Sequence, residues 1–249
     1  MSTNRSRSFL PASLTSGSPI LCLVVTPPAV TLLLLVRHAL TDSTGKTLTG
    51  WTPGVHLSER GQEQAEELAD RLAGAPISAV YSSPLERCRE TTAPLAASAG
   101  LRVRTRANLG EVKYGEWTNR PLSQVSRTRL WVAVQSNPSS ARFPGGESLL
   151  ECQTRVAREA ARIAAAHPGR AVVLVSHGDP IRLLLAHLAG VHTDHFQRLV
   201  VSPASVSAVA VGEGPPRILR VNDTGTLVDL VPPRLAQLRR TAHPKRMRG

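Results

Sequence analysis

The sequence contains little cysteine. Its 249 residues include only Cys22, Cys88 and Cys152, which stand far apart in the chain. There is no Cys-x-x-Cys pair and no Cys/His ligand spacing, so neither a disulfide framework nor a structural zinc site is indicated. Unpaired cysteines are typical of a reducing compartment, and we therefore expect a cytoplasmic protein.

Aromatic residues are also scarce, at 3% of the chain, although hydrophobic residues make up 41%. The core must therefore be built mainly from leucine, valine, isoleucine and alanine. No internal repeat is present. The length suffices for one α/β domain, or for two small ones.

Acidic residues are outnumbered, with 18 Asp and Glu against 30 Lys and Arg and a formal net charge of +12. Such an excess is typical of proteins that bind anionic substrates, nucleic acids or membrane surfaces. Residues 231–249 carry several basic residues and no acid, and we interpret them as a solvated basic tail. No stacking aromatics accompany these charges, so no specific nucleic-acid partner is expected. The basic residues of the tail are Arg234, Arg239, Arg240, Lys245, Arg246 and Arg248.

A long uninterrupted apolar run is missing as well. Residues 20–36 are apolar, but Pro27 and Pro28 divide them into halves too short to cross a bilayer. We expect residues 1–29 to form a disordered N-terminal extension, and no membrane partner. An uncleaved membrane anchor is the alternative interpretation of this segment.

The remaining sequence alternates between predicted strands and predicted helices. This alternation predicts one domain over residues 30–230, a three-layer α/β/α fold with a mostly parallel central sheet. Ser148 and Glu151 predict a capping box, and Pro180 is expected as the first residue of the last helix. Strands are expected over residues 31–36, 79–82, 101–104, 171–175, 205–211 and 218–221. Helices are expected over residues 58–74, 85–99, 122–136 and 148–166, and from residue 180 onwards.

Polar residues follow three of the predicted strands. Arg37 and His38 come after the first strand, Arg87 lies one helical turn beyond the second, and His177 follows the strongest. Ligands of open α/β sheets bind at the carboxyl ends of the strands, so these side chains should converge at one edge of the sheet. Arginine forks and a helix N-terminus both favour phosphate.

Phosphoryl transfer from a monoester also needs a nucleophile and a proton donor. An imidazole can act as the nucleophile, and a carboxylic acid can protonate the leaving oxygen. Glu111 is the best candidate for the acid, because it lies in a glycine-rich loop after the third strand. Glu116 in the same loop is the alternative.

Five sequence blocks together resemble the histidine phosphatase superfamily, in its phosphoglycerate-mutase-like branch. Residues 35–41 (Leu-Val-Arg-His-Ala-Leu-Thr) are similar to its Arg-His-Gly-x-Thr motif, and residues 176–182 contain its Ser-His-Gly motif. Residues 82–91, 57–65 and 143–148 resemble three further blocks. The blocks occur in order along most of the chain, and actinobacterial proteins described as probable phosphomutases are similar.

The resemblance implies a metal-independent phosphomonoesterase without a cofactor, acting on a small phosphate ester. His38 is the implied phosphate acceptor, and Glu111 the implied acid and base. Other phosphate ligands would surround His38. They are Arg37, Arg87, His177, Thr41 and Thr44.

Three positions depart from the family pattern. Ala39 replaces the usual glycine after the nucleophile, and its methyl group is expected to crowd the pocket or restrict the backbone. Thr44 stands where asparagine is common, and residues 117–119 replace the usual Trp-Glu-Gly. Thr41 and Thr44 have a second interpretation, as residues that order the loop. Trp51 and Trp117 are expected beside the site, as loop anchors or as substrate walls.

Two other functions remain open. One is a phosphoglycerate mutase, which residues 49–51 favour and the short stretch between Glu111 and His177 disfavours. The other is a catalytically weakened protein that only binds a phosphate ligand, for which Ala39 is the support. No motif identifies the natural substrate or the oligomeric state. Histidines outside the blocks are interpreted as structural or solvent-facing, namely His56, His167, His187, His192, His195 and His243.

Overall fold

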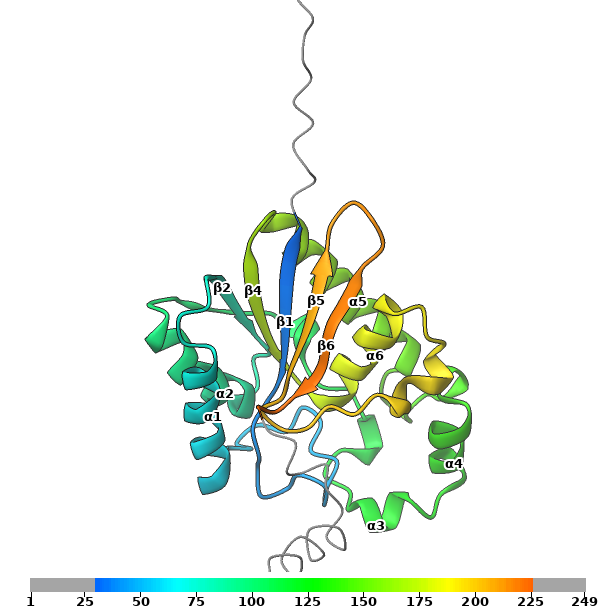
Figure 1. Cartoon of the computed structure of the whole chain (residues 1–249). Coiled ribbons are helices and arrows are strands. Elements are labelled where there is room, and N and C mark those ends of the chain that lie inside the picture. The colour runs from blue at the N-terminus through cyan, green and yellow to red at the C-terminus, as the bar shows by residue number, and fades with distance from the viewer. Residues whose placement is uncertain (1–29, 226–249) are drawn as a thin grey trace, which may run out of the picture.

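The computed structural model describes residues 30–225 of the chain. The predicted extension over residues 1–29, the basic tail over residues 231–249 and the last residues of the predicted domain lie outside this part. One mixed sheet forms its centre, in the strand order β3-β2-β4-β1-β5-β6 (Figure 1). The strands are β1 (Thr31–Arg37), β2 (Ile77–Ser82), β3 (Val103–Thr105), β4 (Ala171–Ser176), β5 (Val206–Val211) and β6 (Arg217–Asp223).

The pairing of the strands confirms a mostly parallel sheet. β1 pairs in parallel with β4, and β2 pairs in parallel with both β3 and β4. β5 is antiparallel to both β1 and β6, so a hairpin closes this side of the sheet. The carboxyl ends of β1, β2 and β4 therefore meet at one edge, where ligands bind in such sheets.

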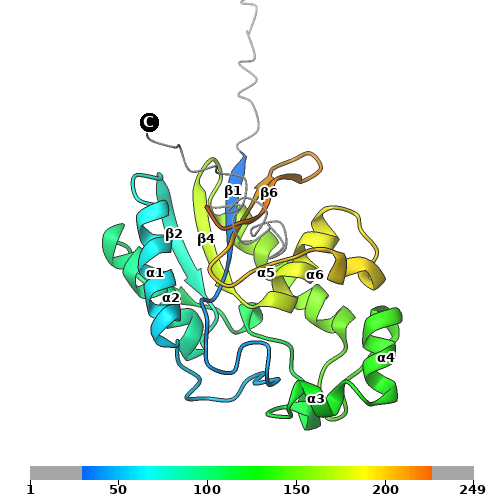
Figure 2. The ribbon, with the colours of Figure 1, turned by 60° about the horizontal axis from the view of Figure 1, so that its bottom comes forward.

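Helices cover both faces of the sheet, which gives the predicted three layers (Figure 2). Leu34 and Val36 of β1 pack on the side of α1 and α2, whereas Leu33 and Leu35 pack toward α5 and α6. Alternate residues of a strand point to opposite faces, so a strand covered on both sides is apolar throughout. The helices are α1 (Glu59–Arg71), α2 (Glu86–Ser98), α3 (Leu122–Val125), α4 (Arg129–Ser136), α5 (Leu149–Ala166) and α6 (Gly178–Leu188).

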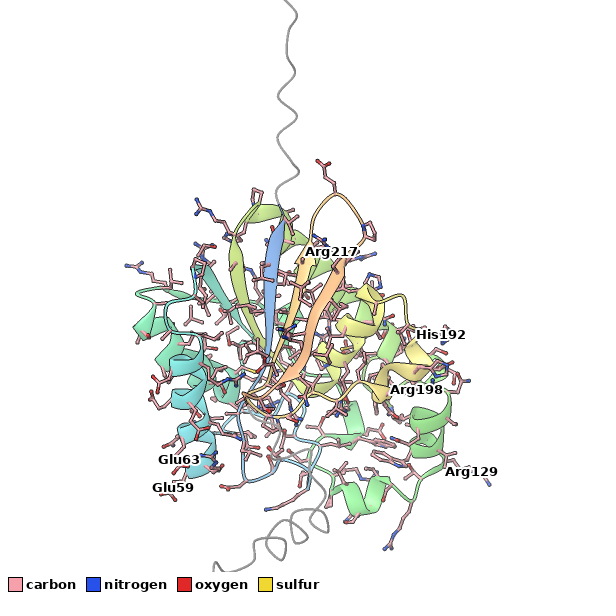
Figure 3. All side chains as sticks on the ribbon, in the orientation of Figure 1. Glu59, Glu63, Arg129, His192, Arg198 and Arg217 are labelled. Atoms are coloured by element: carbon pink, nitrogen blue, oxygen red, sulfur yellow. The ribbon has the colours of Figure 1, made fainter. Side chains whose placement is uncertain are left out.

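Charged side chains lie on the outside of these layers. The labelled Glu59 and Glu63 project outward from α1, and Arg129 and Arg198 project outward on the opposite side of the molecule (Figure 3). All four are exposed. The buried polar residues at the strand ends are therefore exceptions that need an explanation.

Two predicted helices differ from the structure. Residues 122–136 form two helices, α3 and α4, because the chain leaves the helix after Val125 and Thr128 caps a new one by accepting a hydrogen bond from Trp131 N (3.2 Å). α6 begins at Gly178, so Pro180 is its third residue and not its first. Proline is tolerated there because the first-turn N–H groups have no helical partner. The predicted capping box of Ser148 and Glu151 is confirmed.

Candidate active site

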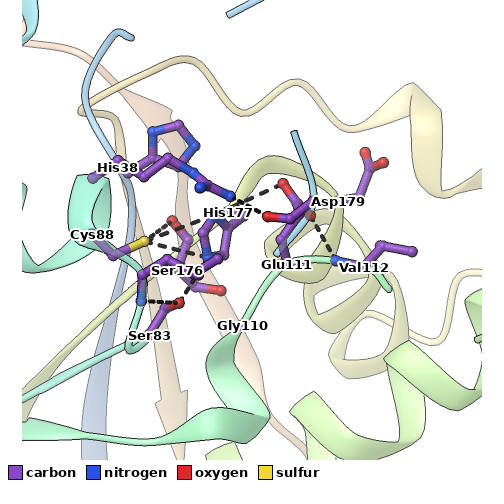
Figure 4. Close-up of polar contacts among 12 residues, drawn as sticks. His38, Ser83, Cys88, Gly110, Glu111, Val112, Ser176, His177 and Asp179 are labelled. Atoms are coloured by element: carbon purple, nitrogen blue, oxygen red, sulfur yellow. Dashed lines mark hydrogen bonds and ion pairs between the residues drawn. The ribbon is translucent and has the colours of Figure 1, made fainter. Parts of the chain in front are cut away.

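The carboxyl ends of β1 and β4 place two buried histidines beside each other. His38 directly follows β1, and its backbone N–H donates to the carbonyl of Ser176 at the end of β4 (2.9 Å). His177 is the N-cap of α6. The two rings lie edge to face, with centroids 5.2 Å apart (Figure 4). The predicted convergence of the strand ends is thus present in the structure.

The ring of His38 is held in the form that a nucleophile requires. Its Nδ1 lies 2.7 Å from the carbonyl oxygen of Ala39. A carbonyl oxygen only accepts, so Nδ1 carries the proton and Nε2 carries the free lone pair. Burial, followed by the charges of Arg87 and Arg37, lowers the pKa of His38 well below its usual value. The imidazole is therefore neutral at pH 7.

Two arginines supply positive charge next to His38. Arg87 is only 1% exposed, and its Nη2 donates to the carbonyl of Gly50 (2.8 Å). Arg37 donates through Nη1 to the carbonyl of Val201 (2.7 Å). Within the described residues, Nη1 of Arg87 and Nε of Arg37 are buried without a hydrogen-bond partner. Buried donors on a cation are costly unless satisfied, so both point to an anionic ligand.

His177 is fully buried and hydrogen-bonded. Its Nε2 lies 2.8 Å from Oγ of Ser83, and its Nδ1 lies 3.8 Å from Oε2 of Glu111. Burial, with the charges of Arg87 and the neighbouring His38, lowers its pKa well below the usual value. Ser83 fixes this ring from the end of β2, a contact that the sequence motif alone did not reveal.

Glu111 is the carboxyl group that faces this cluster. Its side chain is 13% exposed, whereas the alternative, Glu116, is exposed. Burial is the main reason that the pKa of Glu111 rises to about 7, and the nearby carboxylate of Asp179 raises it further. A carboxyl group with such a pKa can both give and take a proton near neutral pH.

The loop that carries Glu111 is held by its backbone. The carbonyl of Glu111 accepts from Nε1 of Trp51 (2.6 Å) and from Nη2 of Arg155 (2.8 Å). Arg155 also donates to the carbonyl of Gly110 (2.9 Å) and pairs with Glu147 (2.6 Å). Trp51 is thus a loop anchor. Arg155 was not predicted from the sequence, because a helical arginine carries no local sign of a distant carbonyl partner.

Thr41 and Thr44 are bonded to each other. Their hydroxyls lie 2.9 Å apart, and Oγ1 of Thr44 accepts from the backbone N–H of Thr41 (3.0 Å). These contacts order the loop after His38, which was one of the two predicted roles. The methyl group of Ala39 packs in a cluster with Leu57, Ala65 and Ala204.

Trp117 and the histidines outside the sequence blocks have structural or exposed positions. Trp117 is buried in a cluster with Trp131 and Phe143, and it also borders a cavity beside Glu111. His167 hydrogen-bonds to Tyr81 (3.0 Å), and His243 lies outside the described residues. The exposed histidines are His56, His187, His192 and His195.

The described residues form neither a metal-binding cluster nor a membrane-spanning helix. No group of three or more His, Cys, Asp or Glu side chains in residues 30–225 is arranged to hold a metal ion. In the same part of the chain, no helix has both the length and the apolar character needed to span a bilayer.

Together, a neutral buried histidine, two arginines with free donors, a second histidine and a protonatable carboxyl group define the site of a phosphoryl-transfer enzyme. A family model described as histidine phosphatase superfamily (branch 1) matches residues 33–224. The chain therefore belongs to the histidine phosphatase superfamily, and the predicted family and fold class are confirmed.

Several known proteins are similar to this chain. Phosphoserine phosphatase 1 of Hydrogenobacter thermophilus is 31% identical over 205 residues, which cover 77% of this chain and 92% of that protein. A probable phosphoglycerate mutase of Yersinia pestis is 31% identical over 161 residues, 64% of this chain and 75% of that protein. The structure of mycobacterial glucosyl-3-phosphoglycerate phosphatase superposes with a TM-score of 0.71 at 27% identity and covers 78% of this chain and 99% of that one. Phosphatases and a probable mutase thus both occur among its relatives.

Proposed function

We propose that this protein hydrolyses a small phosphorylated metabolite through a phosphohistidine formed on His38. The observation that carries the proposal is the state of His38, a neutral ring with Nε2 free, beside two buried arginines that have unsatisfied donors. Glu111 completes the catalytic groups. Because its pKa is raised, its carboxyl group can carry the proton that the leaving oxygen needs.

The reaction has two steps. In the first, Nε2 of His38 attacks phosphorus, the bond from phosphorus to the ester oxygen breaks, and Glu111 gives its proton to the departing alcohol. In the second, Glu111, now a carboxylate, takes a proton from water as the water oxygen attacks phosphorus. The nitrogen–phosphorus bond then breaks, and phosphate and neutral His38 are released.

Positive charge and hydrogen-bond donors around the transferring group stabilise both steps. We assign Arg37, Arg87 and His177 to the phosphate oxygens, because positioning and charge stabilisation supply most of the catalysis of phosphoryl transfer. We include Thr41 and Thr44 as weaker phosphate ligands, since their hydroxyls already bond to each other. The proposed chemistry uses no metal and no cofactor.

Because Cys88 and Cys152 are free thiols, we also propose a cytoplasmic location.

Hydrolysis of 4-nitrophenyl phosphate in the presence of EDTA tests the proposal. We expect turnover by the wild type, a loss of at least about a thousandfold in His38→Ala, and no change in the control His56→Ala, whose ring is exposed. Quenching with labelled substrate should leave an acid-labile phosphoryl label on the wild type but not on His38→Ala. Activity that survives His38→Ala would overturn the assignment of the nucleophile.

The same preparation distinguishes the two alternatives. A mutase would pass its phosphoryl group to an added phosphoglycerate faster than to water. A protein that only binds phosphate would give neither turnover nor a label. The packing of Ala39 in an apolar cluster favours an active enzyme over this last alternative.

A further inference from the structure

A cavity of about 250 Å³ begins at the candidate acid. Arg37, Glu111 and Gly178 border it on the side of the phosphate site, and α4 borders it on the far side. The cavity therefore starts where Glu111 would meet the leaving oxygen. If the phosphate lies among His38, Arg37 and Arg87, the alcohol part of the ester extends into this space.

The far wall of the cavity is aromatic and apolar. Trp117 and Trp131 stack with their ring centroids 6.4 Å apart, and Phe143 meets Trp117 edge to face at 5.4 Å. All three line the cavity, as does Leu149. Such a wall stabilises a planar or apolar group by burial and by ring contacts. It offers little to a group covered with hydroxyls.

The charged residues of the cavity are only partly paired. Apart from Arg37, Arg182 is the one cation among the described residues that line it. Its Nη1 lies 3.2 Å from Oδ1 of Asp179, whereas its Nε is buried without a hydrogen-bond partner. The other oxygen of Asp179 accepts from the hydroxyl of Tyr114 (3.3 Å). A second phosphate or a carboxylate on the substrate would therefore meet the carboxyl groups of Asp179 and Glu111, and an Arg182 whose charge Asp179 already balances.

The volume of the cavity suits a small alcohol. Pockets for drug-sized ligands enclose about 300–1,000 Å³. A cavity of about 250 Å³ accommodates a group of one or two rings.

Resting on the proposed function, we propose that the natural substrate is a phosphate monoester whose alcohol has an aromatic or apolar body of one or two rings. The wall formed by Trp117, Trp131 and Phe143 selects this body. Trp131 is then a specificity-determining residue that touches the substrate, since it lies on α4 at the cavity and is only partly buried.

A series of esters with similar leaving oxygens tests the inference. All of 2-phenylethyl phosphate, glycerol 3-phosphate and 3-phosphoglycerate are esters of primary alcohols, so differences in kcat/KM report recognition of the body. We expect the wild type to hydrolyse the phenylethyl ester at least tenfold more efficiently than the other two. A preference for 3-phosphoglycerate would overturn the inference, and if 4-nitrophenyl phosphate is still hydrolysed through His38 the proposed function stands without it.

Two variants test whether the preference for the phenylethyl ester arises in the cavity. Trp131→Ala should lower kcat/KM for the phenylethyl ester about tenfold and leave glycerol 3-phosphate within twofold, whereas the neighbouring control Val132→Ala, which is 61% exposed, should change neither. Because Trp131 also packs on Trp117, the second variant is Gln135→Arg, at an exposed position of α4 that borders the cavity. The added cation should raise kcat/KM for 3-phosphoglycerate several-fold. Equal losses on all esters in Trp131→Ala, with no gain in Gln135→Arg, would contradict the proposed role of this wall.

Discussion

At the scale of single residues, the structure explains how alanine can stand at position 39, where the family usually has glycine. A methyl group was expected to crowd the phosphate pocket. It lies instead in a small cluster with Leu57, Ala65 and Ala204, and Ala39 has no left-handed backbone angle that would favour glycine. The backbone N–H of Ala39 also keeps a partner, the hydroxyl of Thr91 (2.9 Å). Alanine is therefore compatible with an active site here.

The methyl group of Ala39 is therefore expected to be neutral for activity. Ala39→Gly should leave kcat/KM for 4-nitrophenyl phosphate within about twofold and lower the free energy of unfolding by about 0.4–1 kcal/mol, because glycine increases the entropy of the unfolded chain. Steady-state kinetics and urea unfolding measure the two quantities. A tenfold gain in activity would instead show that the methyl group does crowd the phosphate.

A second residue-scale prediction concerns the proton of Glu111. The pKa of this carboxyl group is raised first by burial and then by the negative charge of Asp179, while the charges of Arg87 and Arg37 oppose the rise. The acid must be protonated for the first step, so kcat/KM should fall as the pH rises through about 7. On the acid side, activity should fall only well below pH 6.5, as His38 becomes protonated.

Asp179→Asn removes the repelling charge but keeps an oxygen that accepts from Tyr114. The pKa of Glu111 should then decrease, and the alkaline limb of the pH profile should move to lower pH while the acid limb stays. The control is Glu116→Gln, in the same loop but exposed. An alkaline limb that does not move in Asp179→Asn, or that moves in Glu116→Gln, would assign the acid to another group.

At the scale of elements, residues 57–65 support the loop that carries His38. The backbone N–H of Leu40 donates to the side chain of Gln64 (3.0 Å), and the carbonyl of Leu40 accepts from the backbone of Ser58 (3.0 Å). A Cβ atom on Gly61 would lie 2.0 Å from that carbonyl oxygen. Glycine is therefore required where this loop crosses the start of α1. Residues 57–65 thus contribute to the site by packing against the loop that carries His38.

Gly61→Ala should force the two elements apart. We expect a loss of about 1–3 kcal/mol in the free energy of unfolding, the usual cost of overpacking. A fall in kcat of tenfold or more should accompany it, because His38 follows the displaced loop. Gly214→Ala is the matched control, since no atom lies within 4 Å of its added Cβ. Wild-type kinetics in Gly61→Ala would show that the crossing does not position His38.

The elements that were predicted well are those with a strong local pattern. Apolar strands and the capping box of Ser148 depend on neighbouring residues, so they could be derived from the sequence. The break at Thr128 was not predicted, because residues 122–136 carry helix formers on both sides of it. The cap itself is local, since the hydroxyl of Thr128 accepts from the backbone N–H of Trp131. Contacts such as that of Arg155 with the carbonyl of Glu111 join positions 44 residues apart and leave no local pattern.

At the scale of the whole molecule, the site is built from three elements. The buried groups that these elements contribute lower the stability of the fold when no anion is bound. Arg37 ends β1, Arg87 lies on α2 and His177 caps α6. Each is buried or nearly so, and two of them have donors without a partner in the described residues. A protein that keeps such groups sacrifices stability for function, and a bound oxyanion should recover part of it.

Orthovanadate, which resembles phosphate, provides the test of this coupling. At one hundred times its dissociation constant, a ligand that binds only the folded state stabilises it by about 2.7 kcal/mol, which corresponds to a rise in Tm of roughly 5–10 °C for a chain of this length. Arg87→Met should abolish this rise. It should also raise the Tm of the anion-free protein, because an apolar side chain of similar length removes a buried cation with an unsatisfied donor. The exposed neighbour Arg89→Ala should respond to vanadate as the wild type does. A vanadate response that persists in Arg87→Met would place the anion elsewhere, and a lower Tm of the anion-free variant would show that Arg87 is held for its packing and for its bond to Gly50.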